Sequence, residues 1–232
     1  MIGIIGAMDV EVKHLKNRLT GSETRTVSGI EFFSGTLCGK KVVVAKCGVG
    51  KVFAAICAEI MILEFGVKCI INTGIAGTLT GRLSVGDTAI STAVVQHDMD
   101  TSAVGDPEGM VSGIDKIYFN AAPALVLKAE QAVKLAGLNY VCGVIASGDR
   151  FIGDSESKKR IVAKFNAVAC EMEGAAIGQV CFVNQVPFVV IRAISDGFDD
   201  AEVDYMTFVR SAAEHSARVV RKTVGRLKGG SL

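Results

Sequence analysis

The sequence predicts an α/β protein with a mixed central sheet. Short apolar runs of strand length alternate with longer segments of helical character along most of the 232 residues, and this alternation is typical of layered α/β domains. A β-hairpin expected over residues 30–47 adds an antiparallel piece to the sheet. No linker interrupts the apolar segments, and half of all residues are hydrophobic, so we expect residues 1–232 to form one domain.

The first half of the chain divides into elements by apolar periodicity and by turn residues. Val12, Leu15 and Leu19 recur at helical spacing. Residues 50–65 are rich in Ala, Ile, Leu and Met, and Gly66 follows them in the position that commonly ends a helix. The elements expected up to residue 97 are a strand over 2–7, a helix over 8–19, hairpin strands over 30–37 and 41–47, a helix over 50–65, and strands over 68–74 and 87–97.

Residues 98–120 have the composition of a loop, with several Asp and Gly residues around Pro107. A loop of this length is uncommon inside a compact domain and usually carries a function. Its Met and Val side chains would be exposed if the loop only covered the surface. We therefore expect residues 98–120 to form a lid or a subunit interface.

The second half returns to alternating strands and helices. Strands are expected where apolar runs are short, and helices where apolar residues recur over ten or more positions. The expected elements are a helix over 124–136, a strand over 141–147, a helix over 155–165, a strand over 167–170, a helix over 173–184, a strand over 188–194 and a helix over 203–227.

Charge and cysteine content limit the partners and the compartment. The 25 basic and 24 acidic residues nearly cancel, so we expect a small-molecule ligand and neither nucleic acid nor a membrane as partner. The seven cysteines include no C-x-x-C pair. Their odd number and the lack of a signal peptide favour a reducing cytoplasm.

Metal and nucleotide cofactors are not expected. The three histidines are scattered without paired spacing, which disfavours zinc. Residues 48–51 read Gly-Val-Gly-Lys but lack the spacing of a phosphate loop. The dinucleotide fingerprint is missing too, because Gly3 and Gly6 lie inside the first strand instead of after it.

Four apolar strands end in small residues or an acid, at Ala7, Gly74, Asp149 and Asp196. If these strands are parallel, their ends share one edge of the sheet, and glycine there lets a ligand approach the backbone closely. The pattern then predicts the floor of a pocket. The alternative for each single end is that Gly and Asp only stop a strand and cap the next helix.

Several charged residues are candidates for chemistry. Glu11 lies in the first turns of a helix, where the dipole favours an acid with or without a catalytic role. Glu171 and Glu173 flank Met172 between two apolar segments, and a buried carboxylate is costly unless it is bonded or functional. Placement alone leaves a functional and a structural role equally open for Glu173, and favours Glu171 as a helix-start acid. Arg192, inside an apolar strand, needs a counter-charge or a ligand.

Five motifs in order along the chain together resemble the bacterial 5'-methylthioadenosine/S-adenosylhomocysteine nucleosidases, which belong to the nucleoside phosphorylase superfamily. The resemblance extends from residue 2 to about residue 225. The motifs are Ile4-Ile5-Gly6-Ala7-Met8 with Glu11, Asn72-Thr73-Gly74 with Ala76-Gly77, Ser147-Gly148-Asp149 with Phe151-Ile152, Glu171-Met172-Glu173, and Arg192-Ala193-Ile194-Ser195-Asp196.

The resemblance implies a three-layer α/β sandwich around a mixed, partly barrel-like sheet, assembled as a homodimer. It implies that Asp196 protonates N7 of adenine, that Ser195 holds Asp196, and that Glu11 activates the attacking water with Arg192 nearby. Glu173 would bind the ribose hydroxyls. These roles suit glycosidic cleavage, in which an acid assists the leaving base and a base activates water.

The resemblance also implies how the substrate is held. Adenine would lie against Phe151 and bond to the backbone of Ile152, near Ala76 and Gly77. The 5'-thio substituent would contact Met8, Val49, Met172 and Phe208, and Thr101 and Val104 of the partner's 98–120 loop would close the pocket. Two positions depart from some family members: Ile75 replaces a Ser that can hold the water, and Ser112 replaces a Pro of the thio pocket.

Three other functions compete with this one. A phosphorylase of the same superfamily would use phosphate in place of water, which requires a cluster of Arg or Lys at the site. A nucleosidase could instead cleave another adenine nucleoside, such as 5'-deoxyadenosine or a menaquinone-pathway intermediate. A non-catalytic nucleoside-binding protein should have lost Glu11, Glu173 or Asp196, and all three are present.

Overall fold

The computed structural model describes residues 1–198 and 201–227, and the last five residues of the expected domain lie outside the described part. Its strands are β1 (Ile2–Gly6), β2 (Thr20–Val27), β3 (Ile30–Leu37), β4 (Lys40–Lys46), β5 (Cys69–Thr78), β6 (Thr88–Gln96), β7 (Tyr118–Asn120), β8 (Tyr140–Ser147), β9 (Ala167–Glu171) and β10 (Phe188–Asp196). Its helices are α1 (Asp9–Lys16), α2 (Lys51–Phe65), the 3-10 turn η1 (Ser102–Val104), α3 (Pro123–Lys134), α4 (Ser155–Phe165), α5 (Gly174–Val183) and α6 (Ala201–Arg226).

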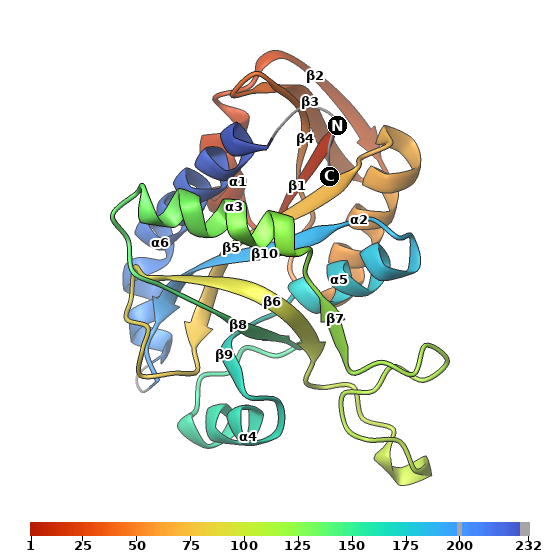
Figure 1. Ribbon diagram of the computed structural model, residues 1–232, viewed down its shortest axis with the longest axis vertical. Helices are drawn as coiled ribbons and strands as arrows, with labels where there is room; N and C mark the ends of the chain where they lie inside the picture. Colours follow the sequence, from red (N-terminus) through yellow and green to blue (C-terminus); the bar gives the residue numbers. More distant parts are fainter. Residues whose placement is uncertain (199–200, 228–232) are drawn as a thin grey trace.

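The strands form one mixed sheet that closes on itself over part of its width. Its order is β10-β6-β8-β9-β5-β1-β4-β3-β2, and β10 also pairs with β5. Strands β10, β6, β8, β9 and β5 therefore form a ring, while β1 to β4 extend from it as an open sheet (Figure 1). The predicted α/β class with a mixed, partly barrel-like sheet is confirmed.

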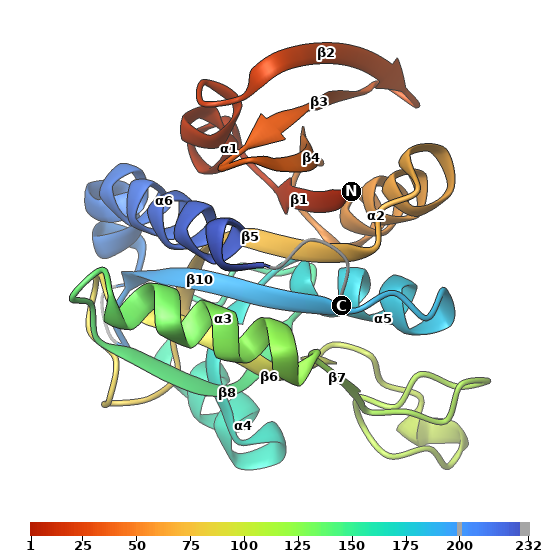
Figure 2. The same cartoon turned by 45° about the horizontal axis from the view of Figure 1, so that its top comes forward.

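Helices cover both faces of the sheet and make it the middle of three layers. Helices α1, α3 and α6 pack together on one face, and α2 packs with α5 on the other (Figure 2). Side chains alternate along β10 accordingly, because successive residues of a strand point to opposite faces. Val189 and Ile191 enter the core under α6, and Val190 enters the core under α2 and α5. Among the described residues, no helix is both long and apolar enough to span a bilayer.

Most expected elements are present, and the main omission is β2. Its residues are exposed except for the last, so the strand has no buried face and no apolar alternation to reveal it. Strand β5 also continues to Thr78, four residues beyond the expected end at Gly74. The 98–120 loop contains η1 and β7 and extends away from the body beside α5 (Figure 1).

The expectation of four parallel strands was wrong for β8. Strands β1, β5 and β10 are parallel, so their ends do meet at one edge. Strand β8 is parallel to β6, and β6 is antiparallel to β10. The closed ring nevertheless brings the end of β8 back to the site, where the Ser147 hydroxyl donates to the Glu171 carboxylate.

Candidate active site

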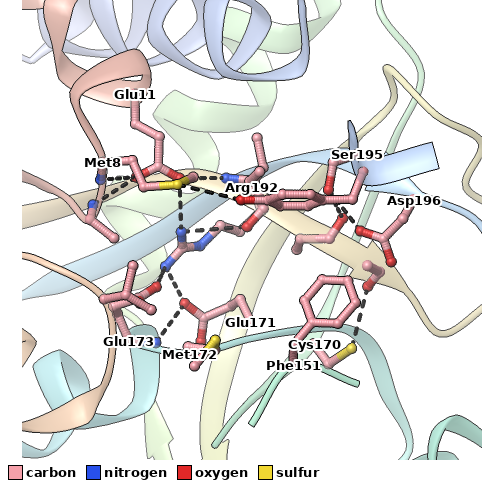
Figure 3. A pocket seen from close by; sticks show the side chains of 16 residues that line it. Met8, Glu11, Phe151, Cys170, Glu171, Met172, Glu173, Arg192, Ser195 and Asp196 are labelled. Carbon is pink, nitrogen blue, oxygen red and sulfur yellow. Dashed lines mark hydrogen bonds and ion pairs between the residues drawn. The ribbon is translucent and has the colours of Figure 1, made fainter. Parts of the chain in front are cut away.

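A cavity of about 470 Å³, open mouth included, lies at the common edge of β1, β5 and β10 (Figure 3). Residues from α1, β5, β9, β10 and α6 contribute to it, together with the loops after β1, β4, β8 and β9. The lining residues are Ala7, Met8, Glu11, Val49, Ile75, Ala76, Gly77, Phe151, Cys170, Glu171, Met172, Glu173, Arg192, Ser195, Asp196 and Tyr205.

Glu11 is held under the floor of the cavity by backbone amides. Its side chain turns back from α1, so that Oε2 accepts from the N–H groups of Ala7 at 2.6 Å and Met8 at 2.9 Å, and Oε1 accepts from Ile75 N–H at 3.1 Å. The carboxyl is 1% exposed. Burial raises its pKa above the ordinary value, against the opposing effects of Arg192 and of the three amides. The surface acid that Glu11 could have been is in fact a buried, oriented carboxyl.

Arg192 joins the carboxyl groups of the site. It is 1% exposed, and its Nη2 donates to Asn72 Oδ1 at 2.6 Å, to Glu171 and to Glu173 Oε2 at 3.3 Å. Its Nη1 lies 3.9 Å from Glu11 Oε1. Three carboxyl groups thus supply the counter-charge that was predicted for Arg192. Removing one of these four charged side chains would leave uncompensated buried charge.

Glu171 and Glu173 have different environments although only Met172 separates them. Glu171 accepts from the backbone N–H groups of Glu173 and Gly174 at the start of α5, which agrees with a helix-start acid. Both carboxyl groups line the cavity, but Glu173 accepts from Gly50 N–H at 2.9 Å, in the loop before α2. Burial raises the pKa of Glu173 to about 7, with Arg192 opposing and Glu171 adding to the rise.

Asp196 lies at the opposite end of the cavity from Glu11 (Figure 3). The register between β10 and β5 shifts between Ile194 and Asp196, and such an irregularity re-aims side chains at the end of a strand. The Ser195 hydroxyl donates to Asp196 Oδ1 at 2.7 Å. Burial raises the pKa of Asp196, and the bond from Ser195 and the nearby Lys158 ammonium oppose that rise.

Apolar side chains form the walls between these two ends. Met8, Val49 and Met172 line the cavity as expected. The Phe151 ring meets the Tyr205 ring edge to face at 5.5 Å, and the Tyr205 hydroxyl lies 3.5 Å from Met8 Sδ. The wall therefore combines two aromatic rings with thioether sulfur, a surface suited to flat or sulfur-containing groups.

The remaining predicted residues lie outside this cavity. Ile152 lines an adjoining hollow beside Phe151 and Asp196. Phe208 is 37% exposed and is not among the lining residues, whereas Tyr205, one turn earlier on α6, is. Thr101 and Val104 are in the 98–120 loop, and Val104 is 83% exposed. Ser112, in the same loop, donates to Asp106.

Three residues of the site and its surroundings were not predicted from the sequence: Tyr205, Cys170 and Lys158. Tyr205 and Phe208 are three residues apart on one helix, so helical periodicity alone could not decide which ring faces the cavity. Cys170 follows three apolar residues in β9, as a core residue would. Lys158 lies in the polar run Ser-Glu-Ser-Lys-Lys-Arg, where a lysine is expected to face solvent.

Gly77 gives a prediction about the spacing around Asp196. A Cβ atom at Gly77 would lie 2.5 Å from Asp196 Oδ2, so we expect Gly77→Ala to displace that carboxyl and to lower kcat about 10–100-fold. Gly81→Ala is the control, because a Cβ at Gly81 meets nothing within 4 Å. Steady-state kinetics of both variants test this, and equal kcat values would show that the Asp196 position is not critical.

Comparison with known proteins places this arrangement in a family. The family model described as the phosphorylase superfamily matches residues 1–225. A 5'-methylthioadenosine/S-adenosylhomocysteine nucleosidase of Shewanella sp. (strain MR-7) is 42% identical, over 100% of this chain and 99% of that protein. The crystal structure of the nucleosidase of that name from Neisseria meningitidis, in complex with methylthio-immucillin-A, superposes with a TM-score of 0.94 at 37% identity, over 97% of this chain and 99% of that one.

A second solved structure is named for another activity. It is a futalosine hydrolase of Helicobacter pylori, with a TM-score of 0.93 and 34% identity, over 97% of this chain and of that one. The fold and the matched residues define the chain as a member of the phosphorylase superfamily. Within that superfamily it belongs to the family of the 5'-methylthioadenosine/S-adenosylhomocysteine nucleosidases.

Proposed function

We propose that the protein hydrolyses the N-glycosidic bond of 5'-methylthioadenosine and S-adenosylhomocysteine, giving adenine and the 5-thioribose product. The observation that carries this proposal is the pair of oriented carboxyl groups, Glu11 and Asp196, at opposite ends of one cavity. The similarity to nucleosidases over the full chain supports the substrate class. Methionine salvage and homocysteine recycling are the processes that this reaction would serve.

Asp196 is the proposed general acid. Cleavage builds oxocarbenium character on the ribose, and a proton delivered to N7 makes adenine a better leaving group. The acid must hold a proton near neutral pH, and burial raises the pKa of Asp196 in that direction. The Ser195 hydroxyl bond fixes one carboxyl oxygen, which leaves Oδ2 as the atom for the proton.

Glu11 is the proposed base for water. Two of its backbone bonds hold Oε2, so the carboxylate has one fixed orientation. Ile75 carries no hydroxyl to hold the water, but its backbone N–H donates to Glu11 Oε1. The proposed role of Ile75 is therefore to position the base, while the base itself positions the water.

Water is favoured over phosphate by the charges at the site. Glu11, Glu171 and Glu173 surround the single Arg192 guanidinium, whose Nη2 already donates to three side-chain oxygens. A phosphate dianion needs free cationic donors. Carboxylates this close would repel it.

The walls suggest where the rest of the substrate lies. Adenine would stack against Phe151 with its edge toward Ile152, Ala76 and Gly77. Glu173, with its raised pKa and its place at the cavity surface, would bind the ribose hydroxyls. The thio substituent would contact Met8, Val49 and Met172, with Tyr205 in place of the predicted Phe208.

A homodimer would complete the pocket. Helix α2 exposes an apolar stripe at Val52, Ile56 and Leu63, with exposed fractions of 69%, 40% and 68%. A helix that is apolar on its outer face is usually buried against a partner. The 98–120 loop extends from the same side of the molecule, with α5 between it and α2 (Figure 2), and its Thr101 and Val104 would reach a second copy's cavity.

Ile56→Asp tests the dimer. A charge buried in an apolar interface is costly, so we expect the mass measured by sedimentation at micromolar concentration to fall from two chains to one. Leu127→Asp changes a residue that is 50% exposed on α3 and should leave the mass unchanged. A monomeric wild-type protein would contradict the proposed assembly.

The cytoplasm is the proposed location. All seven cysteines are free thiols, five of them buried. Unpaired cysteines are typical of a reducing compartment.

Adenine release from a set of nucleosides tests the substrate class. The set is 5'-methylthioadenosine, S-adenosylhomocysteine, 5'-deoxyadenosine and futalosine, each assayed with the purified protein. We expect kcat/KM to be highest for the two thio nucleosides, because the wall that would hold the substituent carries Met8 and Met172. Release from futalosine alone would assign the chain to the activity of its Helicobacter pylori neighbour.

A further inference from the structure

Lys158 is a buried lysine beside the proposed general acid. It is 0% exposed and lies on α4 in a buried stripe with Ile161 and Phe165. Its Nζ is 3.4 Å from Asp196 Oδ2 and donates to the Gly197 carbonyl oxygen. The Phe198 ring centroid lies 5.9 Å from the same ammonium. None of the roles proposed for the cavity residues involves this lysine.

Packing alone does not explain a lysine at this position. An apolar side chain would continue the stripe, whereas a buried ammonium loses its hydration and needs a partner. Replacing a buried ion pair by apolar groups is often neutral or stabilising. The pair therefore calls for an explanation in the chemistry of Asp196.

The charge on Asp196 changes during the proposed reaction. The O–H bond of Asp196 breaks as an N–H bond forms at N7 of adenine, and the electron pair of the O–H bond stays on the carboxylate. The electron pair of the glycosidic bond moves onto the leaving adenine. A fixed cation at Oδ2 interacts weakly with the neutral acid and strongly with the anion, so it stabilises the transition state more than the ground state.

We propose that Lys158 is a positioning residue of this reaction, which holds the Asp196 carboxyl and stabilises the carboxylate that forms when the proton leaves. This inference rests on the proposed function of Asp196 as acid. The geometry assigns Oδ1 to Ser195 and Oδ2 to Lys158. The opposing effects of burial and of Lys158 on the pKa of Asp196 agree with it.

Other groups also act on Asp196 and enter its pH dependence. Asp204 on α6 adds to the rise in the pKa of Asp196. The negative charge of Asp196 in turn contributes to the raised pKa of Tyr205, on the same helix, and of Cys170, on β9. Among the described residues that act on Asp196 in this way, Lys158 is the cation.

Lys158→Met tests the inference, with Lys159→Met as the control on the exposed side of the same helix. The measurement is kcat and KM for 5'-methylthioadenosine between pH 5 and pH 10. Without the cation the pKa of Asp196 rises further and the acid becomes weaker. We therefore expect kcat to fall about 10–100-fold, KM to change less than about threefold, and the loss of activity at high pH to begin about one pH unit higher.

A purely structural role predicts a different result. In that case Lys158→Met lowers the melting temperature while its pH profile stays at that of the wild type, and the inference is overturned. Lys158→Arg, which keeps the charge, should retain the wild-type pH profile even if its kcat falls. Lys158→Gln replaces the Met variant if that protein does not fold. A wild-type protein that releases no adenine contradicts the proposed function itself.

Discussion

Asp196→Asn is expected to lower kcat about 10²–10⁴-fold with 5'-methylthioadenosine as substrate. The amide keeps the size of the carboxyl and can still accept the Ser195 bond, but it has no acidic proton to give to adenine. General acid catalysis by one positioned group is worth this much. Steady-state kinetics at the pH optimum measure the effect.

Substrate binding separates this loss from misfolding. The Asp196→Asn protein should bind 5'-methylthioadenosine in calorimetry with a Kd within about tenfold of the wild-type KM, because the walls at Phe151 and Met172 are unchanged. A variant that turns over at the wild-type rate would remove Asp196 from the mechanism.

Glu11→Gln is the second change with a large expected effect, again about 10²–10⁴-fold in kcat. An amide cannot take a proton from water. It also cannot accept at both ends, although Oε2 accepts from Ala7 and Met8 while Oε1 accepts from Ile75. One backbone donor would face an NH₂ group, so we expect the free energy of unfolding to fall by about 1–3 kcal/mol as well.

Asp9→Asn is the matched control for Glu11→Gln. Asp9 lies in the same first turn of α1, but its side chain is 68% exposed and pairs with Lys46. An exposed pair of this kind contributes little, so activity and stability should stay at wild-type values. A Glu11→Gln enzyme with more than a tenth of the wild-type kcat would show that water needs no base at this position.

The fold class and the Asp196 end of the site could be predicted because they depend on local signals, whereas the place of Glu11 in the site followed only from the family resemblance. Strand and helix alternation is visible in the apolar pattern. The apolar run of β10 ends visibly at Asp196. A charged residue inside an apolar strand, as at Arg192, signals a buried partner from the sequence alone.

The closure of the sheet was expected only from the family resemblance, because pairing between strands far apart in the sequence leaves no signal in the local sequence. Strand β10 pairs with β5 on one side and β6 on the other, and only this closure returns β8 and its Ser147 to Glu171. The inward direction of Lys158 could not be predicted either, because the amino-terminal half of α4 is polar and gives no sign of a buried face. Tyr205 was not predicted because it lies three residues from Phe208 on the same helix, and helical periodicity allows either ring to face the cavity.

Because three carboxyl groups surround Arg192, we expect the site to be sensitive to single changes. Each has a different set of backbone donors: Ala7 and Met8 for Glu11, Gly174 for Glu171, and Gly50 for Glu173. The donors come from separate elements, so the sheet edge as a whole fixes the charges. Precise placement of this kind is what electrostatic catalysis requires.

Adenine release with and without inorganic phosphate tests the central claim most directly. The wild-type protein is incubated with 5'-methylthioadenosine in parallel buffers, and the sugar product is identified by mass. Hydrolysis with Glu11 as water's base predicts equal rates in both buffers and free 5-methylthioribose as the product. A rate that depends on phosphate, with a sugar 1-phosphate as the product, would contradict the account.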